Sequence, residues 1–341
     1  MIFSNHDFDC HLNVELFIIK SMKNFLKIFF PLLSVLFLSL SCRSEKGNRT
    51  AAPESLSPDL LDLRAQVAFP GRIVFQSDLD GENEIYLLTS DHLSRLTDNS
   101  WEDTYPRWSP DGKKIAFSAN PAGNYDLFVM DENGENIARL TASPEDEMDL
   151  AWAPDGQSIV FSKRVKKTLG KQLSIWILDL SSKQERRAIP DFSGANILPD
   201  LSPSAPLLAF TGKKILGWDV FVCDLDSQEY NDLTKGGKAC RPRFSPDGQK
   251  IVYVSHKADG KGDIWTMNPD GSNQQRITER DEAYDYFPSW SPDGKQVVFC
   301  SNLKSAYADK GDWALYLVSV EDKSVSLLFD SLGRDVFPDW R

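Results

Sequence analysis

The sequence predicts an all-β fold, a six-bladed β-propeller of four-stranded blades that spans residues 71–341. Three observations predict it: a phrase that recurs six times, short apolar runs after most copies, and an incomplete first unit that the last residues can complete. The anchor residue of the phrase is Trp in four copies, and consecutive anchors lie 44, 49, 43, 46 and 50 residues apart. The anchors are Trp108, Trp152, Leu201, Phe244, Trp290 and Trp340.

The recurring phrase describes the end of a strand followed by a tight turn. Tyr105–Gly112 reads Tyr-Pro-Arg-Trp-Ser-Pro-Asp-Gly, and Phe287–Gly294 reads Phe-Pro-Ser-Trp-Ser-Pro-Asp-Gly. In the turn, Pro fixes φ at the second position and Gly tolerates a positive φ at the fourth. Pro also stands two residues before the anchor in five copies. Because Pro donates no hydrogen bond, it suits an edge strand, and the strand that lines the channel of a propeller is such an edge.

The remaining strands of each unit follow the turn. A short apolar strand comes first, such as Ile115–Phe117 or Ile251–Tyr253. A strand with an aromatic third residue follows, as at Asp126–Phe128, and a segment like Arg139–Thr141 ends the unit. These runs are almost continuously apolar, which is typical of a sheet covered on both faces. One such sheet cannot cover itself, so we expect the units to stack around a ring.

The two ends of the repeat region predict how the ring closes. The first unit begins at Gly71 and lacks a Pro-x-Trp strand of its own. Residues Phe337–Arg341 supply one spare copy of that strand. We therefore expect the last strand to join the first blade.

The N-terminal segment resembles a bacterial lipoprotein signal. Lysines precede the apolar run Ile28–Leu40, which is too short for a comfortable membrane span, and small residues then lead to Cys42. Residues 1–42 are therefore predicted to be a signal peptide that ends in a lipobox-like sequence, with the lipid on Cys42. Acidic residues suit the start of such a signal poorly, so Met22 is the expected first residue. An ordinary signal peptide or an uncleaved anchor is the alternative.

Residues 43–70 are largely polar, show no apolar periodicity over most of their length, and are predicted to be a flexible tether. The whole chain has 38 basic and 50 acidic residues, a net charge of −12, which argues against a nucleic-acid-binding protein. Four His and five Cys are too few for a His-rich metal site or a dense disulfide framework, so we expect no metal and no cofactor. Cys223 and Cys240 could form a bridge between blades, or all three late cysteines, Cys300 included, could be free thiols.

The repeats resemble the WD40-like β-propeller repeat (PD40) of TolB-related proteins. The resemblance rests on Phe-Pro-x-Trp-Ser-Pro-Asp-Gly, on the Asp-Ile-Tyr type of strand and on Arg-Leu-Thr, and it covers residues 71–341. TolB carries an α/β domain before its propeller, and residues 43–70 are too few for one. The resemblance therefore implies a TolB-like lipoprotein without that domain, on the periplasmic side of the cell envelope, with the outer membrane favoured over the inner.

A candidate interaction surface lies before each anchor. The residue five positions upstream is acidic in four of six copies, and in a propeller this position precedes the innermost strand and surrounds one mouth of the channel. The acidic residues are Asp103, Glu147, Asp285 and Asp335. Nearby aromatic residues are Trp101, Tyr105, Phe287 and Phe337. This mouth is predicted to dock a partner through charge; the alternative is that each acid caps a turn into its strand.

Two functions from different classes remain. The first is a non-catalytic, monomeric envelope lipoprotein whose propeller binds one or more envelope proteins and whose lipid binds the membrane. The second is a glycan- or small-ligand-binding or hydrolytic module that uses the channel mouth. A propeller-bearing Ser peptidase would need a Gly-x-Ser-x-Gly motif, which the sequence lacks, so we expect no enzyme.

Overall fold

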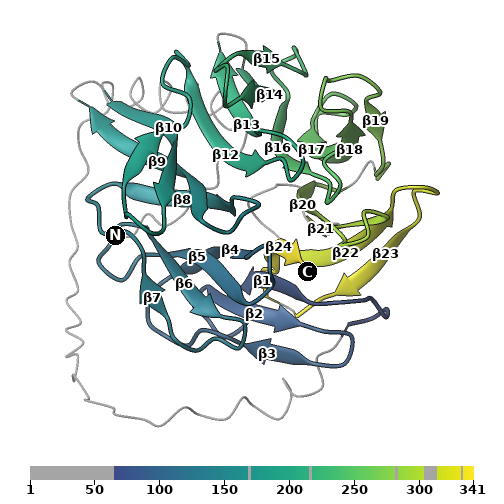
Figure 1. Ribbon diagram of the computed structural model, residues 1–341. Coiled ribbons are helices and arrows are strands. Elements are labelled where there is room, and N and C mark those ends of the chain that lie inside the picture. Colours follow the sequence, from purple (N-terminus) through teal and green to yellow (C-terminus); the bar gives the residue numbers. More distant parts are fainter. Residues whose placement is uncertain (1–64, 168–169, 215–216, 281–282, 303–312, 332) are drawn as a thin grey trace, which may run out of the picture. The chain divides into compact units, whose positions relative to one another are not determined.

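The computed structural model describes residues 65–341 apart from 168–169, 215–216, 281–282, 303–312 and 332. Within these residues, six four-stranded antiparallel sheets surround a central channel (Figure 1). The predicted all-β, six-bladed propeller is therefore confirmed. No helix in the described part of the chain has the length and apolar character needed to cross a membrane. The predicted signal peptide, Met22 and Cys42 lie outside the described residues.

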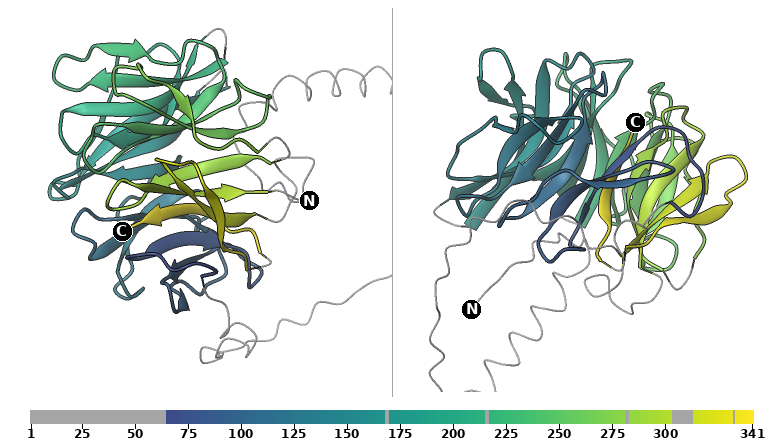
Figure 2. Two further views of the ribbon diagram at one scale, coloured as in Figure 1. Left: turned by 90° about the vertical axis from the view of Figure 1, so that its right-hand side faces the viewer. Right: turned by 90° about the horizontal axis from the view of Figure 1, so that it is seen from below.

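The strands occupy four equivalent positions from the channel outward, and Figure 2 shows the twisted blades from two further sides. The innermost strands are β24 (Val336–Trp340), β4 (Asp103–Trp108), β8 (Asp146–Trp152), β12 (Ala195–Leu201), β16 (Ala239–Phe244) and β20 (Asp285–Trp290). The second strands are β1 (Ile73–Ser77), β5 (Lys114–Ala119), β9 (Ser158–Lys167), β13 (Leu207–Lys214), β17 (Ile251–Ser255) and β21 (Gln296–Ser301). The third strands are β2 (Glu84–Leu88), β6 (Asp126–Asp131), β10 (Gly170–Asp179), β14 (Gly217–Asp224), β18 (Asp263–Met267) and β22 (Ala314–Ser319). The outermost strands are β3 (Leu93–Arg95), β7 (Ala138–Arg139), β11 (Glu185–Arg187), β15 (Tyr230–Asp232), β19 (Gln275–Arg276) and β23 (Val325–Phe329).

Each blade has one aromatic pair between its second and third strands. In the first blade Phe75 stands opposite Tyr86, and in the second Phe117 stands opposite Phe128. The second-strand member of the pair is fully or almost fully buried in all six blades. Cross-strand aromatic pairs stabilise a sheet beyond the burial of their area. The six pairs are Phe75–Tyr86, Phe117–Phe128, Phe161–Trp176, Phe210–Phe221, Tyr253–Trp265 and Phe299–Tyr316.

The Asp-Ile-Trp and Arg-Ile-Thr segments of the fifth blade contact each other. The guanidinium of Arg276 lies 2.7 Å from the buried carboxylate of Asp263, and the backbone N–H of Ile264 donates to the hydroxyl of Thr278 at 3.0 Å. Burial raises the pKa of Asp263 to about 7, and Arg276 opposes that rise. The same kind of contact recurs in the first and second blades. These recurring residues hold the outer strand to the third strand.

The last strand closes the ring as predicted. β24 pairs antiparallel with β1, with Trp340 opposite Ile73, and the two lie side by side in Figure 1. Two backbone hydrogen bonds between Arg72 and Arg341 extend this pairing, at 2.6 and 2.8 Å. Residues 65–70, the end of the predicted tether, pack on the propeller: the Phe69 ring lies edge-on to that of Trp340 at 5.7 Å.

Candidate functional site

Each innermost strand carries a β-bulge that points one side chain at the channel. In β4, Tyr105 and Pro106 together stand opposite Phe117, so one residue is extra. The first bulge residue has a φ of 52–59° in all six blades. Non-glycine residues adopt this region only where the surrounding structure holds them there. The six residues are Tyr105, Asp149, Leu198, Arg241, Phe287 and Phe337.

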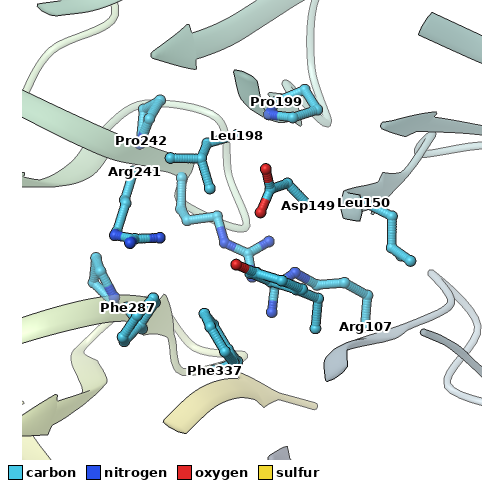
Figure 3. Close-up of a pocket in the computed structure, with 12 residues that line it drawn as sticks. Arg107, Asp149, Leu150, Leu198, Pro199, Arg241, Pro242, Phe287 and Phe337 are labelled. Carbon is cyan, nitrogen blue, oxygen red and sulfur yellow. The ribbon is translucent and has the colours of Figure 1, made fainter. Parts of the chain in front are cut away.

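These bulge residues fill the middle of the channel (Figure 3). The ring centroids of Tyr105 and Phe287 lie 4.0 and 4.2 Å from that of Phe337. The guanidinium of Arg241 stacks on Phe287, 4.1 Å from the ring centroid. The space left among them is about 30 Å³, enough for about one water molecule. Side chains therefore separate the two mouths of the channel.

Asp149 brings a carboxylate into this largely apolar region. Burial raises the pKa of Asp149 above its ordinary value, and the positive charges of Arg241 and Arg107 oppose that rise. Figure 3 shows the Asp149 carboxylate and the Arg107 side chain both extending toward the middle of the channel. The middle of the channel therefore combines an aromatic cluster with a small set of opposite charges.

A larger cavity, of about 260 Å³, lies where the innermost strands end. We call it the anchor mouth, because the six anchor residues form its walls: Trp108, Trp152, Leu201, Phe244, Trp290 and Trp340. Prolines of the turns after these strands form its rim, and Pro154, Pro203, Pro246 and Pro292 are exposed. The cavity thus opens at the ends of the strands, whereas the predicted mouth lies at their beginnings.

The residues one position before the anchors form the floor of the anchor mouth, and they are Arg107, Ala151, Asp200, Arg243, Ser289 and Asp339. Arg243 lies 3.3 Å from the carboxylate of Asp200 and 3.1 Å from that of Asp339. Each aspartate also accepts a backbone N–H, Asp200 from Phe244 at 2.7 Å and Asp339 from Trp108 at 2.8 Å. The charges of the floor therefore link innermost strands from four blades.

The four acidic residues predicted at the other mouth are buried. Asp103, Glu147 and Asp335 are 0% exposed and Asp285 is 1% exposed. They are therefore not the exposed acidic docking surface that the sequence analysis predicted, because their carboxylates face neighbouring loops and strands instead of solvent. The interpretation that such acids cap turns fits Asp335, which accepts from the backbone N–H of Ser331 at 2.9 Å and from its hydroxyl at 2.6 Å.

The other three carboxylates have partners within the propeller. Asp103 accepts from the side-chain amide of Asn99 at 2.6 Å. Glu147 pairs with Lys163 at 2.8 Å. Asp285 pairs with Arg280 at 2.7 Å, and all three partners come from loops or strands next to the acid. Burial raises the pKa of Asp103 to about 7 and that of Asp335 to about 7. Burial also raises the pKa of Glu147, which Lys163 opposes.

The predicted aromatic residues do not form one surface. Trp101 is 38% exposed on the loop before β4. Tyr105, Phe287 and Phe337 instead lie in the middle of the channel, where they pack on one another. The structure thus brings three of the four aromatic residues together, but they fill the middle of the channel instead of forming a surface at its mouth.

Sequence reasoning missed the anchor mouth. The signal was present in the variable x of the Pro-x-Trp phrase, which is charged in four of the six copies: Arg107, Asp200, Arg243 and Asp339. Opposite charges at equivalent positions of a closed ring predict ion pairs across it.

The late cysteines are not part of any site described above. Cys223, Cys240 and Cys300 are buried and none of them is in a disulfide bond, so the bridge between Cys223 and Cys240 is wrong and the alternative of three thiols is confirmed. Burial raises the pKa of the Cys223 thiol to about 11. A buried thiol with a raised pKa is a poor nucleophile at neutral pH.

The curated relatives found by comparison are longer proteins, and this chain matches only part of each. An uncharacterized protein of Agrobacterium fabrum is 35% identical over 136 residues, which is 39% of this chain and 45% of that protein. A protein named dipeptidyl-peptidase 5, from Porphyromonas gingivalis, is 27% identical over 80% of this chain and 39% of its own length. The chain thus spans less than half the length of these relatives.

Comparison with solved structures supports the fold. The crystal structure of TolB from Acinetobacter baumannii has a TM-score of 0.67 at 20% identity, over 81% of this chain and 68% of that one. A family model described as the TolB beta propeller domain matches residues 70–173 and 169–308. These segments cover more than half of the chain and most of the six blades, and the chain belongs to the family of TolB beta-propeller (PD40) domains.

Proposed function

We propose that this protein is a non-catalytic protein of the bacterial cell envelope whose propeller is a scaffold for protein–protein interaction, with a segment of the partner bound at the anchor mouth. The observation that carries this proposal is the open cavity of about 260 Å³ at the ends of the innermost strands. Its rim of exposed prolines and its aromatic walls offer apolar contact, and its floor offers charge. Trp and Arg are the residue types most enriched among the residues that dominate binding at protein interfaces.

The exposed prolines of the third and fifth blades allow a direct test. The double change Pro154→Glu and Pro246→Glu places two carboxylates on the rim without touching the buried walls. We expect most of the partner that co-purifies with cross-linked wild type from envelope fractions to be lost, because each charge must be desolvated when a segment docks.

Pro144→Glu is the matched control. Pro144 is also exposed, but it precedes β8, whereas Pro154 follows it, so the two lie at opposite ends of one strand. The control should retain the partner as wild type does. If the rim variant and the control retain the same partners in the same amounts, the anchor mouth is not the docking site.

We further propose that the protein is a lipoprotein on the periplasmic side of the envelope, anchored through Cys42. Two acyl chains suffice for stable attachment to a bilayer where one chain is marginal. Cys42→Ala is therefore expected to move the protein from the membrane fraction to the soluble periplasmic fraction. Cys300→Ala, at a buried cysteine of the propeller, is the control for the loss of a thiol. A Cys42→Ala protein that stays with the membrane to the same extent as the control contradicts the lipid anchor.

The second candidate function is a module that binds or hydrolyses a glycan or small ligand at the channel mouth. Its support is the volume of the anchor mouth, which approaches that of small-molecule sites, and a relative named as a peptidase. Turnover of dipeptide or glycan substrates that the Pro154→Glu, Pro246→Glu variant loses would favour it. The scaffold proposal also takes the protein to be a monomer that binds no nucleic acid, consistent with its net charge of −12.

A further inference from the structure

Arg107 differs from the other charged residues on the floor of the anchor mouth. Arg243 faces two carboxylates, and both aspartates accept a second hydrogen bond from the backbone. For Arg107 the hydrogen bond found among the described residues runs from Nη1 to the carbonyl of Pro106, at 3.0 Å. Its buried Nε has no hydrogen-bond partner in the described part of the chain. Arg107 therefore has donors to spare, since a guanidinium carries five.

The position of Arg107 brings its side chain to the anchor mouth. Arg107 lines both the anchor mouth and the small cavity in the middle of the channel. The equivalent position in the next blade is Ala151, a small residue that also lines the anchor mouth. The space next to Arg107 therefore belongs to a cavity that opens toward solvent.

The surroundings of Arg107 disfavour its positive charge, and burial is the main cause. Burial and the neighbouring charge of Arg243 lower the pKa of Arg107 to about 10, and Asp339, Asp200 and Asp149 only partly offset this. Arg107 stays protonated at neutral pH all the same. Arg107 is only partly exposed, and none of the ion pairs found among the described residues includes it, although a charge removed even partly from water is ordinarily paired.

We propose that Arg107 binds the side-chain carboxylate of an Asp or Glu in the partner segment that docks at the anchor mouth. This inference rests on the proposed scaffold function and names the chemistry that the cavity selects. A segment lying across the exposed prolines of the rim can lower one side chain to the floor, where a guanidinium and a carboxylate form paired hydrogen bonds. The net charge of −12 would repel an acidic segment elsewhere on the protein. The contact with Arg107 therefore selects both the sign of the charge and its position in the segment.

The experiment uses the purified full chain and a library of random dodecapeptides displayed on phage, fused so that no peptide has a free C-terminus. Wild type is expected to select peptides with an Asp or Glu at a common position. The selected peptide is then synthesised with an amidated C-terminus, and again with that acid replaced by its amide. We expect the replacement to weaken binding roughly 10- to 100-fold, the range for a hydrogen bond between charged groups.

Protein variants show whether Arg107 is the residue that the acid contacts. In Arg107→Gln the same replacement in the peptide should have little effect, because the two changes remove one interaction. Arg107→Lys keeps the positive charge but not the planar guanidinium that donates two hydrogen bonds to one carboxylate. It should therefore retain part of the preference for the acidic peptide over its amide. Arg186→Gln, at an exposed arginine of β11, is the matched control and should behave as wild type. Replacement in the peptide tests the contact on unaltered protein, so a variant that folds poorly does not decide the outcome.

Several results would overturn the inference. If replacing the acid in the peptide weakens binding to wild type and to Arg107→Gln equally, the acid contacts a residue other than Arg107. Selected peptides that share no acid would also contradict the inference. Binding that needs a free C-terminus would assign the contact to a chain end instead of a side chain. If the peptide binds through Arg107, the Pro154→Glu, Pro246→Glu variant should also bind it weakly. Peptides that bind regardless of the rim variant would instead contradict the scaffold proposal at this mouth, and failure to select any peptide would count against both.

Discussion

A chain that ends at residue 334 is expected to lose cooperative unfolding and to aggregate. The deletion removes β24, and β1 then has an unpaired edge in the middle of the ring. It also removes three buried apolar side chains, Val336, Phe337 and Trp340. Their burial is worth on the order of 5–9 kcal/mol, comparable with the whole stability of a typical domain. Removal of the strand should therefore unfold the first blade and expose both of its neighbours.

Thermal unfolding followed by circular dichroism and light scattering measures this effect. The matched control lacks only residue 341, whose side chain is exposed, although its backbone pairs with Arg72. The control should unfold in one transition at a slightly lower temperature than wild type. A chain without residues 335–341 that melts as sharply as the control would show that the ring does not depend on β24.

The repeats allowed the fold to be predicted because each blade repeats the same local physics. The anchors end the innermost strands, and Phe75, Phe117 and their equivalents fill the same buried position in every blade. Closure also followed from counting, since one unit lacked a strand and the chain held one spare. These features depend on neighbours in the sequence or on the adjacent blade, which a repeating pattern specifies.

The site could not be predicted in the same way because it depends on contacts across the ring. The burial of Asp103 and Asp335 depends on loops whose paths vary between blades, and their partners Asn99 and Ser331 belong to those loops. The packing of Tyr105 against Phe337 depends on a bulge that turns both side chains inward. The repeat pattern shows that both residues precede a Pro, but not that the backbone there has a positive φ.

Asp339→Ala is the point substitution with the largest expected effect on stability. The Asp339 carboxylate accepts from the backbone N–H of Trp108 at 2.8 Å, from the Ser289 hydroxyl at 3.3 Å and from Arg243 at 3.1 Å. These partners belong to three blades other than the one that contains Asp339. The change leaves the N–H of Trp108 without its acceptor and Arg243 with one carboxylate instead of two. We expect a loss of about 2–4 kcal/mol in the free energy of unfolding.

Two milder variants separate the contributions of hydrogen bonding and charge. Asp339→Asn keeps one oxygen that can accept from Trp108 and removes the charge, so it should cost less than Asp339→Ala. Ser289→Ala removes only the longest of the three contacts and should cost less than about 1 kcal/mol. Denaturant unfolding of the three variants gives the order. If Asp339→Ala and Ser289→Ala unfold at the same denaturant concentration, the carboxylate does not join the blades, because its other two hydrogen bonds would then contribute nothing measurable. If Asp339→Ala costs no more than Asp339→Asn but both cost more than Ser289→Ala, the attraction between Asp339 and Arg243 is the larger contribution.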